Sequence, residues 1–352
     1  MKSVGSSKKT ERMSGIELLR ILGIFMVVFI HATGLIQEIP VNSVGAVATR
    51  IINCMGNLGV PAFILISGFF GVKRNWKKMM TLEMKVILYS VCTTVLLRLV
   101  WPMDYPRSVI LPLLEQSVMP VVTRKHWYYS CYMCLLLFAP YINLVIEKIT
   151  EKEYQLLLGA GLVIFCLVPT FLRYDIMQDG GKGLVNMVLL YLLGRYIRLY
   201  QNRKIGAAAG SCVLIALLLV LFGLTYVPVR TNVFALDVLE DNSLTTIAIC
   251  VAALYLFKDM KLQSAVVNRA AEHVFGIYIL NVPVMRVLNH FVFRLDQSRI
   301  SGNLMPVWVS LLVLTTVLVC LILDVLHDKL LSGMEEKICD RVIKYVEKKL
   351  QR

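Results

Sequence analysis

Apolar runs long enough to cross a lipid bilayer recur from one end of this chain to the other. A membrane-spanning helix needs about 20 mostly apolar residues, and the gaps between these runs are too short for a separate soluble domain. Taken with their flanking charges, the runs predict an all-α bundle of about ten transmembrane helices. The predicted spans are 16–36, 56–72, 82–100, 127–146, 155–172, 184–200, 205–226, 243–257, 274–293 and 307–326.

The composition agrees with this fold class. Hydrophobic residues make up 57% of the 352 residues and charged residues only 17%, which excludes an ordinary soluble domain. We predict one transmembrane domain over 16–326, preceded by a basic tail (1–15) and followed by an amphipathic cytoplasmic tail (327–352). The first apolar run lacks a small-residue cleavage pattern, so we predict that it is retained. The nine cysteines, mostly inside apolar runs, are interpreted as small buried residues.

Basic residues indicate the orientation of the chain. With the N-terminus inside, the inner segments hold 23 lysine and arginine residues and the outer loops hold 9. Cytoplasmic loops of membrane proteins carry such an excess, so we predict cytoplasmic termini and a multi-pass protein of the plasma membrane. The net charge of +14 follows from the same bias. Aromatic residues do not interleave the basic ones, which argues against a nucleic-acid partner.

The first span, "LLRILGIFMVVFIHATG", contains two ionisable side chains, Arg20 and His31. At this spacing both lie on one helical face, about 16 Å apart along the axis. An arginine near a helix end can simply extend to the membrane interface. An ionisable group as deep as His31 usually faces a bundle interior or a water-filled cavity. Neutral imidazole can take a proton from a hydroxyl, so His31 is a candidate general base.

Four stretches resemble the membrane acyltransferase-3 family. "ELLRILGIFMVVFIHA" matches its Arg-x10-His motif, and "VPAFILISGFFG" is similar to its phenylalanine-rich run ending in Ser-Gly-aromatic. "HWYYSCYMCLLLFAP" is similar to its Trp-aromatic helix, and "FGIYILNVPV" to its late Phe-Gly-x-Tyr stretch. Two positions depart from the family pattern. Asn281 stands where many relatives have histidine, which favours a hydrogen-bonding role, and Glu17 replaces an aspartate.

The resemblance implies an O-acyltransferase that moves an acyl group, predicted to be acetyl, from cytoplasmic acyl-CoA to a hydroxyl. The implied acceptor is a cell-surface polysaccharide or a lipid-linked glycan. Acetyl-CoA is then a donor co-substrate, no bound cofactor is expected, and the remaining partners are membrane lipids. Arg20 would bind the donor's phosphates or orient a neighbouring group, and His31 would act as base or as transient acyl carrier.

Other residues are candidates for the two substrate sites. Ser67 and Gly68 lie near the predicted depth of Arg20 and are candidates for the donor channel. A small residue such as Gly68 equally suits a close helix contact. Arg286 lies in the outer half of the ninth span and needs a partner there. We predict an acceptor-side or supporting role for it, and stabilisation of the reaction's oxyanion is one such role.

Aromatic residues open the fourth span on the predicted outer side. His126, Trp127 and Tyr128 are either part of an interfacial aromatic belt or a sugar-stacking platform at the acceptor mouth. At the inner end of the last span, Asp324, His327 and Asp328 are interpreted as solvated residues of a cytoplasmic helix terminus. The five histidines lie in different segments without ligand spacing, so no metal site is predicted.

Two readings without acyl transfer remain open at this point. A transporter or flippase also needs many spans and a few intramembrane charges, but the sequence has no internal repeat and no matched pair of broken helices, which many transporters show. A membrane sensory module would make Arg20 and His31 a structural pair, although their axial separation argues against direct pairing.

Overall fold

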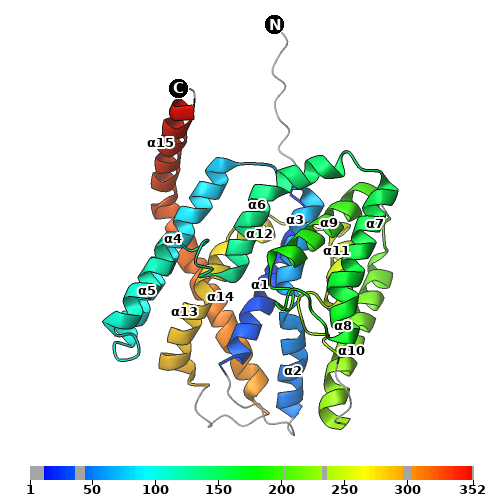
Figure 1. The fold of residues 1–352 in the computed structure, drawn as a ribbon. Coiled ribbons are helices and arrows are strands. Elements are labelled where there is room, and N and C mark those ends of the chain that lie inside the picture. The colour runs from blue at the N-terminus through cyan, green and yellow to red at the C-terminus, as the bar shows by residue number, and fades with distance from the viewer. Residues whose placement is uncertain (1–11, 36–43, 202, 232–235, 296–302, 351–352) are drawn as a thin grey trace.

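The computed structural model describes residues 12–35, 44–201, 203–231, 236–295 and 303–350. Within these residues every regular element is a helix, as the sequence predicts (Figure 1). The first elements are α1 (Ser14–Thr33), α2 (Val44–Gly56), α3 (Gly59–Phe70), α4 (Trp76–Val100), α5 (Arg107–Val118), α6 (Trp127–Ile146), α7 (Glu151–Leu162), η1 (Val163–Leu167) and α8 (Val168–Leu172). They are followed by α9 (Leu184–Tyr200), α10 (Ala207–Thr231), α11 (Leu244–Lys258), α12 (Ala265–Glu272), α13 (Val274–Leu288), η2 (Asn289–Phe293), α14 (Met305–Leu330) and α15 (Ser332–Leu350).

Eight helical segments of the described chain are long and apolar enough to cross a membrane. They are Ser14–Thr33, Val47–Phe70, Trp76–Val100, Trp127–Ile146, Glu151–Leu172, Ala207–Tyr226, Val274–Phe293 and Met305–Leu330. The other two predicted spans fall on α9 and α11, which are only 17 and 15 residues long. The structure therefore supports a polytopic membrane protein with eight candidate spans, and the count of ten remains a prediction.

The start of α1 and the end of α14 lie at the same end of the bundle (Figure 1). The backbone N–H of Ser264 donates to the Ser14 hydroxyl at 3.1 Å, and Arg12 pairs with Glu272 at 2.6 Å, so the beginning of the described chain is fixed beside α12. This arrangement agrees with both ends of the membrane domain facing one side. That this side is the cytoplasm stays a prediction, and most of the predicted basic tail lies outside the described residues.

Helix α1 lies at the centre of the bundle and contacts α2, α3, α11, α12, α13 and α14. Its buried residues include Ile24, Val27, Val28 and Ala32, which are at most 4% exposed. Burial on nearly all sides explains why this first span is apolar around its whole circumference rather than along one stripe. A polar group on the buried part of α1 therefore faces protein or an internal cavity.

Two glycines allow α3 and α9 to pack with their backbones in contact. A Cβ at Gly68 would collide with the Tyr191 carbonyl oxygen, and one at Gly194 would collide with the Leu65 carbonyl oxygen. Only residues without a side chain permit this approach of two helices. Gly68 thus lies at a helix contact, which is one of the two roles that its sequence context left open.

We expect Gly68→Ala to lower the stability of the protein by about 1–3 kcal/mol, because the new methyl group must push α9 away from α3. Thermal unfolding in detergent would measure the loss. Gly159→Ala is the matched control, since a Cβ at Gly159 meets no heavy atom within 4 Å. Equal melting temperatures for the two variants would contradict the close packing of α3 on α9.

The C-terminal helix α15 packs against the start of α4. Lys77 Nζ lies 2.9 Å from Asp340 Oδ1, and the buried Cys339 thiol contacts the Thr81 hydroxyl and the Met84 sulfur at 3.5 Å. Tyr345, on the other side of α15, is 62% exposed. The predicted amphipathic character of this tail is present, and its position on the cytoplasmic membrane surface remains a prediction.

Candidate active site

His31 lies in the last turn of α1, where the central helix meets α13. Its Nδ1 is 2.7 Å from Oδ1 of Asn281, a side chain of α13 with no exposed surface. The Asn281 amide nitrogen donates to the carbonyl oxygens of Ile277 and Tyr278, so the amide oxygen is the atom that faces the imidazole. An amide oxygen only accepts hydrogen bonds, which means that His31 Nδ1 carries the hydrogen and Nε2 keeps a lone pair.

A cavity of about 520 Å³ adjoins this histidine. Its lining comes from α1, the junction of α2 and α3, α4, the start of α6, the loops before α9 and α11, and α13. Three of the predicted candidates, His126, Trp127 and Arg286, line it together with His31. The volume is within the range of small-molecule sites, which are concave and carry a few convergent polar groups. Tertiary packing therefore gathers side chains from one predicted catalytic and three predicted acceptor-side positions.

The start of α6 forms one wall of this cavity. Lys125 donates to the Thr94 hydroxyl and to the Leu113 carbonyl oxygen, each at 3.1 Å, and His126 Nε2 lies 2.9 Å from the Ser90 hydroxyl. Burial and the neighbouring Lys125 charge lower the pKa of His126 to about 4, so its imidazole is neutral at pH 7. Lys125 was not among the predicted site residues.

The aromatic residues of this segment lie at different depths. Trp127 lines the cavity and contacts Tyr128 edge to face at 6.2 Å. Tyr128 is only 6% exposed, stacks on Tyr132 at 5.7 Å and meets Tyr278 edge to face at 5.0 Å. Trp127 can therefore contact a molecule in the cavity, whereas Tyr128 belongs to the aromatic core beneath it.

Arg20 lies nearer the other end of α1, three turns from His31, as the helical spacing predicts. Its Nη1 atom binds both carboxylate oxygens of Glu17, at 3.0 and 3.1 Å, and Glu17 is 6% exposed. The guanidinium also lies over the Phe70 ring at 5.7 Å. Arg20 does not line the His31 cavity, and its structural partner is the acidic residue one turn before it.

Ser67 and Gly68 lie away from the His31 cavity. The Ser67 hydroxyl donates to the Phe63 carbonyl oxygen at 2.9 Å, and Gly68 faces α9 as described above. Both are nevertheless at the C-terminal end of α3, whose Phe70 contacts Arg20. The structure thus brings this segment and Arg20 together at one end of the bundle, apart from the residues around His31.

Arg286 connects the His31 cavity with a second hollow of about 410 Å³. Trp101, Asp104 and His290 line the second hollow, and Arg286 Nη1 donates to the Tyr105 hydroxyl at 3.3 Å. The partner that the sequence led us to expect for Arg286 is therefore a neutral hydroxyl. The aromatic residues of the turn between α4 and α5 were not singled out in the sequence, because their local pattern is that of an ordinary interfacial turn.

Asp241, in the loop before α11, is the carboxylate residue among the described residues that line the His31 cavity. It is 3% exposed, and burial raises its pKa to about 7, although the Lys182 charge acts in the opposite direction. Between about pH 4 and 7 the folded state therefore holds a proton that the unfolded state has released. The free energy of unfolding must fall as the pH rises through this range.

We expect the wild-type melting temperature in detergent to decrease from pH 5 to pH 7.5 through this contribution, and Asp241→Asn to show a flatter profile. The asparagine cannot ionise, so it removes the cost of a buried carboxylate at higher pH, which amounts to a few kcal/mol. Thermal unfolding at several pH values would measure both profiles. Identical slopes for wild type and variant would contradict the burial of Asp241.

A second polar cluster lies at the opposite end of the bundle, where the sequence had suggested a solvated terminus. That interpretation is wrong for Asp324, which has no exposed surface, and for His327, which is 6% exposed, whereas the Asp328 side chain is 42% exposed. Asp324 accepts from Tyr89 at 2.6 Å and lies 2.7 Å from Lys85 Nζ, and both partners belong to α4. His327 Nε2 lies 3.0 Å from Glu335 of α15. A lysine and an aspartate inside two different spans were the sequence signal that could have indicated this pairing.

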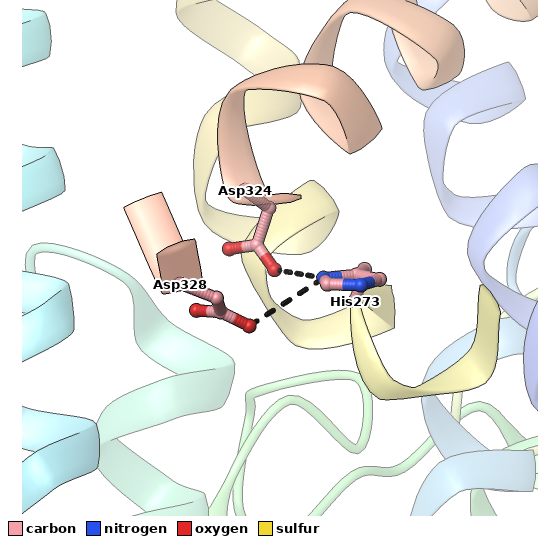
Figure 2. Close-up of side chains that lie close together, drawn as sticks. All are labelled: His273, Asp324 and Asp328. Carbon is pink, nitrogen blue, oxygen red and sulfur yellow. Dashed lines mark hydrogen bonds and ion pairs between the residues drawn. The ribbon is translucent and has the colours of Figure 1, made fainter. Parts of the chain in front are cut away.

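Figure 2 shows how His273, Asp324 and Asp328 converge, with His273 Nδ1 at 2.8 and 3.7 Å from the two carboxylates. One ligand atom from each lies within 4.8 Å of the others, which is a spacing that a metal ion can use. Lys85 Nζ, however, lies 2.7 Å from Asp324 and 3.0 Å from Asp328, so the carboxylates already have a cation. We therefore interpret the cluster as an ion-pair network that joins α4, α13 and α14.

Comparison with known proteins supports one family. The acyltransferase-3 family model, described as an acyltransferase domain, matches residues 13–325, which include α1 with His31 and α13 with Asn281. Comparison with curated proteins and with solved structures gives no match. Because the matched segment is most of the chain and contains the whole cavity, the resemblance seen in four short motifs extends over the entire transmembrane domain. This all-helical membrane protein belongs to the acyltransferase-3 family.

Proposed function

We propose that the protein is a membrane O-acyltransferase that moves an acetyl group from cytoplasmic acetyl-CoA to a hydroxyl of a cell-surface polysaccharide or lipid-linked glycan. Its site of action would be the plasma membrane. The observation that carries the proposal is the hydrogen bond between His31 and Asn281 beside a polar cavity, in a chain of the acyltransferase-3 family. This pair leaves one imidazole nitrogen free to accept a proton or an acyl group.

The proposed chemistry uses His31 Nε2. As a general base, Nε2 takes the proton of the acceptor hydroxyl while the hydroxyl oxygen attacks the thioester carbonyl. The tetrahedral intermediate then collapses, the carbon–sulfur bond breaks, and the imidazolium returns its proton to the departing CoA thiolate. As an acyl carrier, Nε2 attacks the thioester carbonyl first, the carbon–sulfur bond breaks, and CoA leaves as a thiolate. The acceptor hydroxyl then attacks the acyl-imidazole, the carbon–nitrogen bond breaks, and the hydroxyl proton passes to the CoA thiolate. Both routes convert acetyl-CoA and an alcohol into an ester and free CoA.

Asn281 would act as a positioning residue in either route. Its oxygen accepts from Nδ1 and thus fixes both the tautomer and the orientation of the imidazole. Its nitrogen is held by two carbonyl oxygens of α13, so the amide cannot rotate without losing hydrogen bonds. A neutral amide cannot itself take the proton, which leaves the proton on His31 during the reaction.

The donor would approach from the end of the bundle that holds Arg20, Ser67 and Gly68. Glu17 occupies only the Nη1 atom of Arg20, and a guanidinium has further N–H donors available for a phosphate. On the acceptor side, His126 and Trp127 line the cavity and can contact a sugar through a hydrogen bond and an aromatic face. This arrangement gives donor and acceptor opposite routes to His31.

We expect Arg20→Ala to raise the KM for acetyl-CoA about 10-fold to 100-fold with a smaller change in the KM for acceptor, because it removes hydrogen bonds to a charged group. Steady-state transfer by purified protein in detergent or vesicles would measure both constants. Glu17→Gln is the matched control, because it leaves the guanidinium in place. An Arg20→Ala variant with an unchanged KM for acetyl-CoA would assign the arginine to folding instead.

The proposed function is tested by transfer of radiolabelled acetyl from acetyl-CoA into membrane glycans by vesicles that contain the protein. We expect label in the glycan fraction with wild type and none with vesicles that lack the protein. If wild type transfers neither acetyl nor longer acyl groups to a broad glycan pool, the acyltransferase proposal fails. Transport of a glycan or lipid without chemistry would then be the leading function.

A further inference from the structure

Two cations line the His31 cavity without a carboxylate partner among the described residues. Lys125 Nζ bonds only to the Thr94 hydroxyl and the Leu113 carbonyl oxygen, and Arg286 donates only to the Tyr105 hydroxyl. All three acceptors are neutral. The positive charges of Lys125 and Arg286 are therefore hydrogen-bonded but not neutralised within the part of the chain that the structure describes.

Three other cations of the membrane domain have a carboxylate partner. Arg20 lies 3.0 Å from Glu17, Lys85 lies 2.7 Å from Asp324, and Lys182, which lines the same cavity, lies 3.7 Å from Glu240. Pairing is the usual arrangement because an isolated charge in a poorly hydrated site costs several kcal/mol. Lys125 and Arg286 form no such ion pair among the described residues, although Asp104 lines the same hollow as Arg286, and this arrangement needs a reason of its own.

The cost is apparent at Lys125, where burial lowers the pKa of the ammonium. Asp241 does not compensate, because its pKa of about 7 leaves it only partly ionised at neutral pH and it forms no ion pair with either cation. The cavity consequently carries an excess of positive charge next to His31. A cavity of this sign attracts an anion and holds it more strongly than water-exposed cations would.

The phosphates of acetyl-CoA do not account for the positive charge of Lys125 and Arg286, because of where these two residues lie. In the proposed function they approach Arg20, which lies about 16 Å along α1 from His31, at the other end of the bundle. Lys125 and Arg286 come from the start of α6 and the late part of α13, on the acceptor side of His31. An anion bound there would belong to the molecule that brings the hydroxyl.

We infer that the acceptor is an anionic glycan, and that Lys125 and Arg286 bind its carboxylate or phosphate group while a neighbouring hydroxyl reaches His31. The inference rests on the proposed function and adds to it the charge of the substrate. Arg286 can hold either anion through two parallel N–H donors, and Lys125 adds a point charge. Trp127, and Trp101 in the adjoining hollow, provide aromatic faces for the sugar rings.

Binding to the purified protein in detergent tests this inference without any acyl transfer. The probes are methyl glucuronide, glucose phosphate and neutral methyl glucoside, followed by tryptophan fluorescence and by the shift in melting temperature. We expect an anionic probe to bind wild type more tightly than the glucoside, with an affinity that falls as salt rises. A preference for the glucuronide would indicate an acidic sugar, and a preference for the phosphate would indicate a phosphorylated or lipid-linked one.

Three variants locate the anion. Lys125→Met and Arg286→Gln should each weaken binding of the anionic probe about tenfold or more, since each removes a charged hydrogen bond. Lys77→Met is the matched control, because this lysine pairs with Asp340 and does not line the cavity, and it should bind like wild type. The salt dependence of wild type needs no variant, so the inference stays testable if a substitution prevents folding.

Several results would overturn the inference. Equal binding of glucoside and anions by wild type would show that no anion site exists. A raised KM for acetyl-CoA in Lys125→Met and Arg286→Gln would assign the two cations to the donor's phosphates. A lower kcat with an unchanged acceptor KM, for neutral and anionic acceptors alike, would assign them to the reaction's oxyanion. Failure of wild type to transfer acetyl would overturn the proposed function but leave the binding measurements interpretable.

Discussion

His31→Ala should lower acetyl transfer by about 10²-fold to 10⁴-fold, because it removes the proposed base or acyl carrier from the reaction. The variant should still fold, since His31 is only half-buried and its bond to Asn281 is the hydrogen bond that the structure records for its ring. Initial rates of label transfer at equal protein amounts would measure the loss. The KM for acetyl-CoA should change little, because the donor's phosphates are proposed to bind near Arg20.

Leu22→Ala is the control on the same helix, because Leu22 is 37% exposed and does not line the cavity. It should transfer acetyl at nearly the wild-type rate. Asn281→Leu should transfer acetyl at a rate between those of His31→Ala and Leu22→Ala. It should also change the pH profile of kcat, because His31 would then lose the acceptor that fixes its tautomer. A His31→Ala variant within tenfold of wild type would exclude His31 as the residue that carries the chemistry.

The second large effect is on stability. Asp324→Ala should lower the free energy of unfolding by about 3–5 kcal/mol, because it leaves Lys85 without its closest buried partner. Asp324 is fully buried and also accepts from Tyr89, so the substitution breaks several contacts at once. Thermal or denaturant unfolding in detergent would measure the loss.

Asp340→Ala is the matched control for this substitution. Asp340 also pairs with a lysine of α4, at 2.9 Å from Lys77, but both side chains of that pair are more than 40% exposed. An exposed pair contributes about 0–1 kcal/mol, so the control should differ little from wild type. Equal destabilisation by the two substitutions would mean that burial of Asp324 does not decide the stability of the network.

The Asp324 network also fixes the helix that carries Asn281. His273 immediately precedes α13, and the backbone of α13 comes so close to Asp324 that a Cβ at Gly276 would collide with its carboxylate. Asp324→Asn, which keeps a polar group of the same shape, should therefore destabilise less than Asp324→Ala. Transfer by the folded fraction of each variant would show whether the position of α13 affects His31.

Local sequence patterns were sufficient for the fold class and for the central pair of residues. A membrane-spanning helix is recognised from a run of consecutive apolar residues, so the apolar runs predicted α1, α4, α6 and α14 directly. Helical periodicity placed Arg20 and His31 on one face, and this follows from α1 being continuous through both. The four short motifs were sufficient to indicate the acyltransferase-3 family.

Local sequence patterns were less informative about helix length and residue burial where a helix packs against several neighbouring helices. Helices α9 and α11, with 17 and 15 residues, are shorter than the length that a helix needs to cross a bilayer. Close backbone packing on α3 holds α9 in place. Two polar residues at the end of the last span, Asp324 and His327, were misjudged because neighbouring helices bury them. Their burial depends on Lys85 and Tyr89 of α4, which no local pattern connects to Asp324.

The sequence by itself determined that this chain is an all-helical membrane protein of the acyltransferase-3 family with Arg20 and His31 at two depths of one helix. Arg20 pairs with Glu17 one turn before it, so only the partner of His31 was decided by the tertiary structure. Asn281 is 250 positions from His31, and the pairing exists because α13 packs against α1. Lys125 and Arg286 likewise share a cavity only through packing of helices far apart in the chain. Helix formation and membrane insertion depend on contiguous residues, whereas a site depends on contacts between distant ones, which a single sequence does not encode in any local pattern.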